Sequence, residues 1–272
     1  MTLTLGQFPW QRPPWHGGTA KYRLGLRPIS IEHWFQGAPS AELRVHKFGL
    51  LRRDYPQAVQ TVEGSETAQR LLAEKMQKHR WFCPDLGARD SFPDLLAALS
   101  LQVADDLCLM ESSGEQRLVA ASVCSPSYWN VLEKIGLPMS AIHEPVVTLQ
   151  GKIGQQIQRF IRQAPLMTPF ERSNWFVHGD QKRQHLKPEG AISGMPDQWY
   201  LRSERETLCR FSDDFLLFTI NVRFAPLRDV FRYPIALADL QTSLAVFDED
   251  EVAYFGGADK YRRLRAYLAT AN

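Results

Sequence analysis

Helical spacing of hydrophobic residues is found in the N-terminal half of the chain, and the C-terminal tail has a helical composition. After Ser65, the segment ETAQRLLAEKMQKH repeats apolar residues every three or four positions, which predicts an amphipathic helix over residues 65–79. A second helix is expected over residues 92–104. The tail, which ends in DKYRRLRAYLATAN, is also helical in composition. Residues 1–20 are rich in Pro, Gly and aromatic side chains, which predicts an arm packed on the body.

The middle of the chain has patterns typical of strands. Two apolar runs around a Gly-containing turn predict a β-hairpin, and aromatic and β-branched residues predict three later strands, the last two joined by a tight turn. Two helical segments separate these groups. In chain order the elements are strands over 106–111 and 117–124, helices over 127–136 and 152–161, and strands over 172–179, 199–211 and 215–224.

This order favours antiparallel pairing, because hairpins stand at both ends of the strand-forming region. An antiparallel sheet with helices collected on one face is an α+β domain. We therefore divide the chain into an N-terminal arm with helices (1–104), a core (105–226) and a helical tail (227–272).

The composition is typical of a globular protein, with 272 residues, 44% hydrophobic and 23% charged. A net charge of +2 gives no drive toward nucleic acid or a membrane surface. No apolar run reaches the roughly 18 residues of a membrane span, and the N-terminus does not resemble a secretion signal. These features predict a cytoplasmic protein. The four cysteines lack CxxC spacing, so we expect reduced core thiols.

Several catalytic motifs are absent. Neither GxGxxG nor GxxxxGK[ST] occurs, so the chain offers no recognisable site for nucleotide phosphates. His143 and Glu144 begin like HExxH, but Val147 stands where the second zinc ligand is required. No GxSxG element occurs either.

His143 follows the apolar Ile142 and lies two residues before Pro145, which disfavours a helical conformation at Glu144 and so fixes the local direction of the chain. A histidine on such an element is either a hydrogen-bonded residue at a helix end or an axial ligand, since neutral imidazole commonly binds haem iron. The sequence pattern alone leaves both interpretations open.

The segment around His143 resembles the signature of the haem-dependent oxidative N-demethylase alpha-subunit-like family. In that family a CxPSxW element leads into KxGxPLxxIHxPVPG. The matching residues are Cys124, Pro126, Ser127, Trp129, Lys134, Gly136, Pro138, Ile142, His143, Pro145 and Val146. Further similar blocks are YRLGLRPI with HW (22–34), DLCLM (106–110), and NW (174–175) with LRSERETLCR (201–210).

The chain departs from the family pattern at several positions. Val147 and Thr148 replace the final Pro-Gly of the second element, and Glu206 stands where Gln is expected. These changes bear on the shape of the pocket and on the choice of substrate.

The resemblance implies a PAS-like domain, in which a five-stranded antiparallel sheet with flanking helices holds haem b. The implied activity is a monooxygenase reaction, the oxidative N-demethylation of a small secondary amine such as dimethylamine to a primary amine and formaldehyde. It requires O2 and electrons, and the chain has no flavin, nicotinamide or iron–sulfur motif, so an NAD(P)H-dependent reductase subunit is expected as partner. The alternatives are a haem-binding PAS-type sensor without turnover and a member of the family that has lost haem.

The resemblance also suggests site residues. His143 is the expected iron ligand, and Trp129 is expected beside the haem. His178, at the end of the strand over 172–179, is the rival ligand, but it lies outside the blocks that carry the resemblance. Trp175 is either a core aromatic or a wall for a small cation.

Strand alternation adds two candidates over residues 199–211. Arg205 shares a face with less polar neighbours and is expected either to contact a haem propionate, and so to serve catalysis, or to form a structural ion pair. Glu204 lies on the other face with Arg202 and Glu206, and it is expected either to hold a protonated amine as a catalytic and substrate-binding residue or to be solvated.

Overall fold

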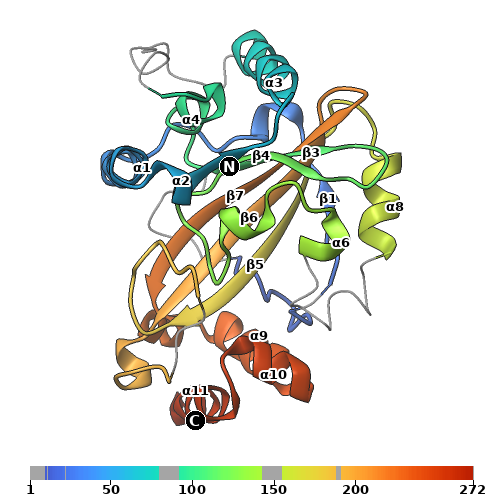
Figure 1. Cartoon of the computed structure of the whole chain (residues 1–272). Coiled ribbons are helices and arrows are strands. Elements are labelled where there is room, and N and C mark those ends of the chain that lie inside the picture. The colour runs from blue at the N-terminus through green and yellow to red at the C-terminus, as the bar shows by residue number, and fades with distance from the viewer. Residues whose placement is uncertain are drawn as a thin grey trace.

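A single antiparallel sheet organises the chain in the computed structural model, which describes residues 10, 12–21, 23–79, 92–142, 155–187 and 191–271 (Figure 1). The described strands are arranged in the order β1-β5-β6-β7-β3-β4-β2, and every neighbouring pair is antiparallel. The strands are β1 (Arg27–Pro28), β2 (Val59–Thr61), β3 (Asp106–Glu111), β4 (Leu118–Ser122), β5 (Phe170–His178), β6 (Tyr200–Arg210) and β7 (Phe215–Pro226).

The α+β class is confirmed, and the sheet is wider than the sequence patterns predicted. The five expected strands are the inner ones, β3 to β7. The two additional strands, β1 and β2, have two and three residues and lie at opposite edges of the described sheet. Strands this short contain too few residues to show an alternating pattern, so periodicity could not reveal them.

The helices lie before, between and after the strands. The α-helices are α1 (Ala41–Arg53), α2 (Tyr55–Ala58), α3 (Glu66–His79), α4 (Leu95–Ser100), α5 (Val131–Lys134), α6 (Met139–Ile142), α8 (Gln155–Gln163), α9 (Pro234–Ala245), α10 (Glu249–Phe255) and α11 (Ala258–Leu268). Short 3-10 helices are η1 (Ile31–His33), η4 (Pro196–Gln198), η5 (Leu227–Arg232) and η6 (Ala269–Ala271). The helix expected over 65–79 is confirmed, and the helical tail is also confirmed.

Two expected helices are shorter than predicted. The helix expected over 92–104 is reduced to α4, and the helix expected over 127–136 is reduced to the four residues of α5. Ser127 instead forms a β-bridge with His185, and Tyr128 has a φ of 57°, so the chain is not helical before Asn130. The Asn130 side chain then accepts a hydrogen bond from the backbone N–H of Leu132 and caps α5.

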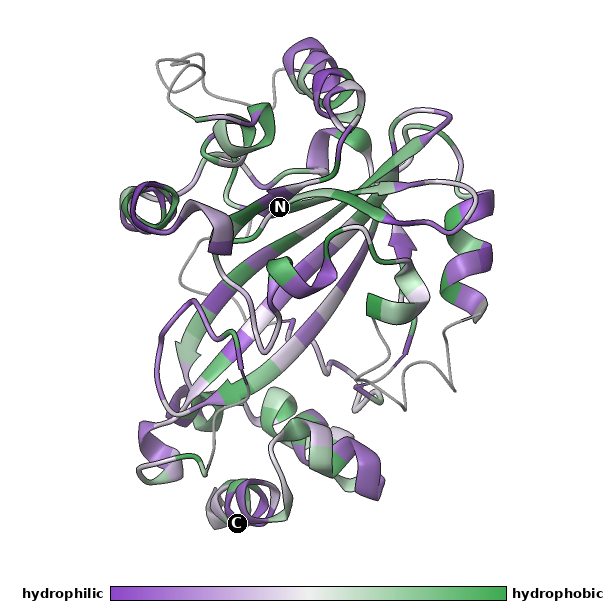
Figure 2. Cartoon of the chain, viewed as in Figure 1, coloured by the Kyte–Doolittle hydropathy of each residue, from purple (hydrophilic) through white to green (hydrophobic). Residues whose placement is uncertain are grey.

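Helices pack on both faces of the sheet, so the expectation that they collect on one face was wrong. On β3, Leu107 and Leu109 belong to a core cluster with residues of α3 and α4. The alternate residues Cys108 and Met110 belong to a cluster on the opposite face with residues of α5 and α8. Both faces therefore carry buried side chains along the central strands. Hydrophilic bands nevertheless interrupt these strands in Figure 2.

The C-terminal helices and the N-terminal arm pack together near the ends of β5 and β6 (Figure 1). Trp15 is fully buried in the same cluster as Trp175, and its indole Nε1 donates a hydrogen bond of 2.7 Å to the carbonyl of Ala236 in α9. The backbone N–H of Gly17 donates to the Asp239 carboxylate on the same helix at 2.7 Å. These bonds hold the described residues 12–21, the part of the arm that ends at Lys21, against the body.

Two further sequence predictions concern the whole chain. Cys108, Cys124 and Cys209 are buried free thiols, as expected, and Cys83 lies outside the described residues. Within the described ranges, no helix has both the length and the apolar character to cross a membrane.

Candidate functional site

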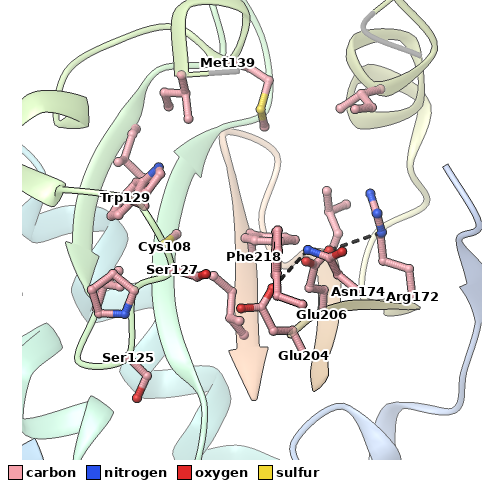
Figure 3. A pocket seen from close by; sticks show the side chains of 18 of the residues that line it. Cys108, Ser125, Ser127, Trp129, Met139, Arg172, Asn174, Glu204, Glu206 and Phe218 are labelled. Atoms are coloured by element: carbon pink, nitrogen blue, oxygen red, sulfur yellow. Dashed lines mark hydrogen bonds and ion pairs between the residues drawn. The ribbon is translucent and has the colours of Figure 1, made fainter. Parts of the chain in front are cut away.

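A cavity of about 250 Å³ lies against one face of the sheet, beneath the segment that carries α5, α6 and α8 (Figure 3). Most of its wall is apolar and comes from β3, β4, β6, β7, the loop before α5, and the helices α6 and α8. The apolar and sulfur-containing side chains of the wall include Cys108, Met110, Leu118, Val123, Trp129, Met139, Ile142, Ile157, Leu208, Phe218 and Ile220.

One end of the cavity is polar, and it is built by cross-strand pairs of β5 and β6. Asn174 lies directly opposite Glu204, and Arg172 lies opposite Glu206. Because side chains alternate along a strand, all four project from the same face of the sheet into the cavity. Figure 3 shows them gathered across from Trp129 and Met139.

Hydrogen bonds fix the orientation of the Glu204 carboxylate. One oxygen accepts from Nε of Arg202 at 2.8 Å, and the other accepts from Nδ2 of Asn174 at 3.1 Å. Arg202 is itself held by the carbonyls of Ser125 and Arg183. The Glu204 carboxylate is therefore positioned at the cavity by two side chains whose own places are fixed.

The N-terminal arm supplies Lys21 to the same end of the cavity. Its Nζ donates a hydrogen bond of 2.8 Å to Oδ1 of Asn174 and lies 3.9 Å from the centre of the Phe176 ring. Burial lowers the pKa of Lys21 to about 7, although the charge of Glu204 opposes this shift.

Two other groups of the polar end have shifted pKa values. Burial raises the pKa of the Glu206 carboxyl, against the opposing effect of Arg172, which forms an ion pair with Glu206 at 3.2 Å. Burial also raises the pKa of Tyr254 in α10 to about 12, so its phenol is neutral at physiological pH. Such shifts are common where charged groups are assembled in a desolvated site.

The structure brings two of the residues suggested by the sequence into this cavity. Trp129 lies in the apolar wall, and Glu204 lies at the polar end. His143 lies outside the described residues, and its described neighbour Ile142 lines the cavity.

Arg205 and Trp175 lie on the opposite face of the sheet and are not among the described residues that line the cavity. Nε of Arg205 donates to the Glu171 carboxylate at 2.5 Å, and its other nitrogens donate to the carbonyls of Trp34 and His33 at 2.9 and 2.7 Å. Trp175 packs edge-on against Trp15, with 5.2 Å between ring centres. These surroundings match the structural alternatives raised for both residues.

His178, the rival ligand, is fully buried at the end of β5. Its ring stacks on that of His185 with 4.7 Å between centres. His178 also does not line the cavity in the described part of the chain.

The family of the chain follows from a comparison with protein-family models. The model for haem-dependent oxidative N-demethylase, alpha subunit-like proteins matches residues 38–265. The chain belongs to this family. No curated protein sequence matches it. The family description points to a haem-dependent oxidative enzyme and, as an alpha subunit, to partnership with other subunits.

The lining of the cavity is compatible with a haem, the cofactor named in the family description. A haem presents a large apolar surface, and the cavity wall is formed mainly by aliphatic, aromatic and sulfur-containing side chains. No cluster of three or more His, Cys, Asp or Glu side chains able to hold a metal ion occurs among the described residues. Haem iron needs only one or two protein ligands, so a haem site does not depend on such a cluster.

Sequence reasoning missed several residues of the polar end. Arg202 and Glu206 share the strand face of Glu204, so alternation placed them there without assigning them a role. Arg172 and Asn174 join them only through the pairing of β5 with β6, which a single sequence does not give. Lys21 precedes the range matched by the N-demethylase-like family model, and no sequence pattern indicated it.

Proposed function

We propose that this chain is the catalytic subunit of a haem-dependent oxidative N-demethylase that acts on a small secondary amine such as dimethylamine. The observation that carries the proposal is the cavity, in which an apolar wall faces a fixed carboxylate, together with membership of the family. The net reaction converts dimethylamine, O2, two electrons and two protons to methylamine, formaldehyde and water.

The cofactor in this proposal is haem b, bound with His143 as the iron ligand and with Trp129 and its apolar neighbours against the macrocycle. Support comes from the lining of the cavity, because both Trp129 and the residue before His143 contribute to it. A bound haem supplies the activation of dioxygen, which protein side chains cannot perform. The inner strands β3 to β7 support a PAS-like core, because their succession of hairpin, helices and three further strands matches the expected one.

The chain's own residues bind and orient the substrate in this proposal. Glu204 accepts a hydrogen bond from the N–H of the protonated amine, because a cation in a desolvated pocket needs an opposite charge close by. Arg202 and Asn174 hold that carboxylate in place. The apolar wall receives the methyl groups and excludes water.

Electrons come from a separate reductase subunit in this proposal, one that is NAD(P)H-dependent and carries flavin or iron–sulfur groups. The support is the family description as an alpha subunit and the lack of sequence motifs for those cofactors in this chain.

The proposal is tested with full-length protein expressed with a haem supply. We expect a Soret band that is lost in His143→Ala and retained in His178→Ala. With a reductase, we expect formaldehyde that depends on dimethylamine and falls at least 100-fold in Glu204→Gln, because the counter-charge is lost. A Soret band without amine-dependent formaldehyde favours the sensor alternative. The absence of a Soret band after haem reconstitution contradicts the proposed chemistry.

A further inference from the structure

The polar end of the cavity contains more basic than acidic side chains. Arg172, Arg202 and Lys21 face Glu204 and Glu206 there. Four of the five are buried, and Arg172 is partly buried. When all five are ionised, the end of the cavity has an excess of one positive charge. A protonated secondary amine adds a second, and burying uncompensated charge is costly.

Lys21 is the basic lining residue, among those described, that can remove this excess. Arginine does not lose its proton in proteins, so Arg172 and Arg202 stay charged. The pKa of Lys21 is lowered to about 7, first by burial and also by the charge of Arg172. A neutral Lys21 amine still carries N–H groups and can keep its hydrogen bond to Asn174. The geometry of the site is therefore compatible with both states of Lys21.

The other charged or titratable groups near Lys21 affect its protonation but do not themselves remove the excess positive charge. On β6, Glu204 and Glu206 favour the charged form of Lys21. Tyr254 on α10 is an uncharged phenol at physiological pH, and burial raises its pKa further, to about 12. Lys260 on α11 disfavours the charged form, and its Nζ is held by the carbonyl of Phe255 at 2.8 Å.

We propose that Lys21 balances the charge of the substrate site, so that binding of the amine cation expels the proton of Lys21 to solvent. This inference rests on the proposed function. In the binding step the Lys21 ammonium and a free dialkylammonium become a Lys21 amine, a bound dialkylammonium and one released proton. The carboxylate of Glu204 then faces the substrate cation and Arg202, without the charge of Lys21. Lys21 is a positioning residue that sets the selectivity of the site for cationic ligands.

The experiment titrates dimethylammonium chloride into the haem-loaded full chain by calorimetry at pH 6 and pH 8. Two buffers of different ionisation enthalpy are used, so that proton release is measured separately from binding. We expect close to one proton released per amine bound at pH 6 and close to none at pH 8. Affinity at pH 6 should be about tenfold weaker than its limit at high pH, since the free site must first lose a proton.

Two variants of Lys21 separate its charge from its other effects. Lys21→Met should bind without proton release, with about the same affinity at both pH values. Lys21→Arg keeps a permanent charge, so it should release no proton and bind more weakly at both pH values. If Lys21→Met does not fold, as judged by circular dichroism, the wild type and Lys21→Arg still decide the question. Proton release that persists in a folded Lys21 variant overturns the proposal.

Glu206→Gln identifies the rival source of the proton, because burial raises the pKa of Glu206. Proton release that is lost in Glu206→Gln and kept in Lys21→Met assigns the proton to Glu206 and overturns the role of Lys21. Failure of the wild type to bind dimethylammonium at pH 8 contradicts the proposed function itself. Binding with unchanged proton release in the Lys21 variants contradicts only this inference.

Discussion

Glu204 and Arg205 are adjacent in the sequence, and their side chains have different surroundings because β6 turns alternate residues to opposite faces. The Glu204 carboxylate lines the cavity, where hydrogen bonds from Arg202 and Asn174 fix its orientation. Arg205, 5% exposed, is surrounded by acceptors, and the carboxylate it binds belongs to Glu171 on β5. Burial raises the pKa of Glu171, but Arg205 and Arg27 outweigh it and hold the pKa below its ordinary value.

We expect Arg205→Met to lower the free energy of unfolding by about 3–5 kcal/mol, because it leaves a buried carboxylate and two carbonyls without their donor. The matched control is Arg27→Met, which removes the other, 53% exposed partner of Glu171 and should cost about 0–1 kcal/mol. Urea unfolding at pH 7 measures both losses. Equal losses contradict the structural role of Arg205. If the Arg205→Met protein folds but loses its Soret band, the result supports the alternative that Arg205 contacts the haem.

At the scale of single residues, alternation predicted the faces of β6 correctly but not which face borders the cavity. Trp175 is an example, because its aromatic character suits a core and a cation-binding wall equally well. Its neighbour Asn174 reaches the cavity instead. The difference depends on which helices cover which face, and that is decided by packing across distant parts of the chain.

At the scale of elements, the inner strands were predictable because each is long enough to show its pattern. The edge strands β1 and β2 and the short helix α5 were not, since long-range pairing decides them. The described part of the arm contains no strand or helix, and its place depends on a few anchoring side chains. Trp15 is the main anchor, six residues before Lys21.

We expect Trp15→Ala to lower the free energy of unfolding by about 3–5 kcal/mol, because it leaves a large cavity beside Trp175 and removes the bond to Ala236. It should also increase hydrogen exchange at the N–H of Gly18, which donates to the carbonyl of Trp15. Ile235→Ala, on an exposed side chain of α9, is the control and should change stability by less than about 0.5 kcal/mol. Unchanged exchange at Gly18 in Trp15→Ala contradicts the anchoring role.

At the scale of the whole molecule, the buried charges of the cavity connect stability with pH. The pKa of Lys21 is about 7 in the folded protein, against 10.5 for an exposed lysine. Between these values the unfolded chain binds a proton that the folded chain does not. The free energy of unfolding therefore rises with pH across this interval, by about 1.4 kcal/mol per pH unit from this one group. Below about pH 7 both states bind the proton, and the cost of burying the charge is present in full.

We therefore expect Lys21→Met to be more stable than the wild type at pH 6.5, and the difference should shrink as the pH rises toward 9.5. Urea unfolding at intervals of half a pH unit measures the difference between the two proteins. Lys182→Met, which removes a lysine that is 75% exposed, should follow the wild type over the same range. A difference that does not change between pH 6.5 and 9.5 means that Lys21 keeps its proton in the folded protein. In that case an amine cation enters a cavity that holds three permanent positive charges. The carboxylates of the cavity must then compensate for these charges without release of the Lys21 proton.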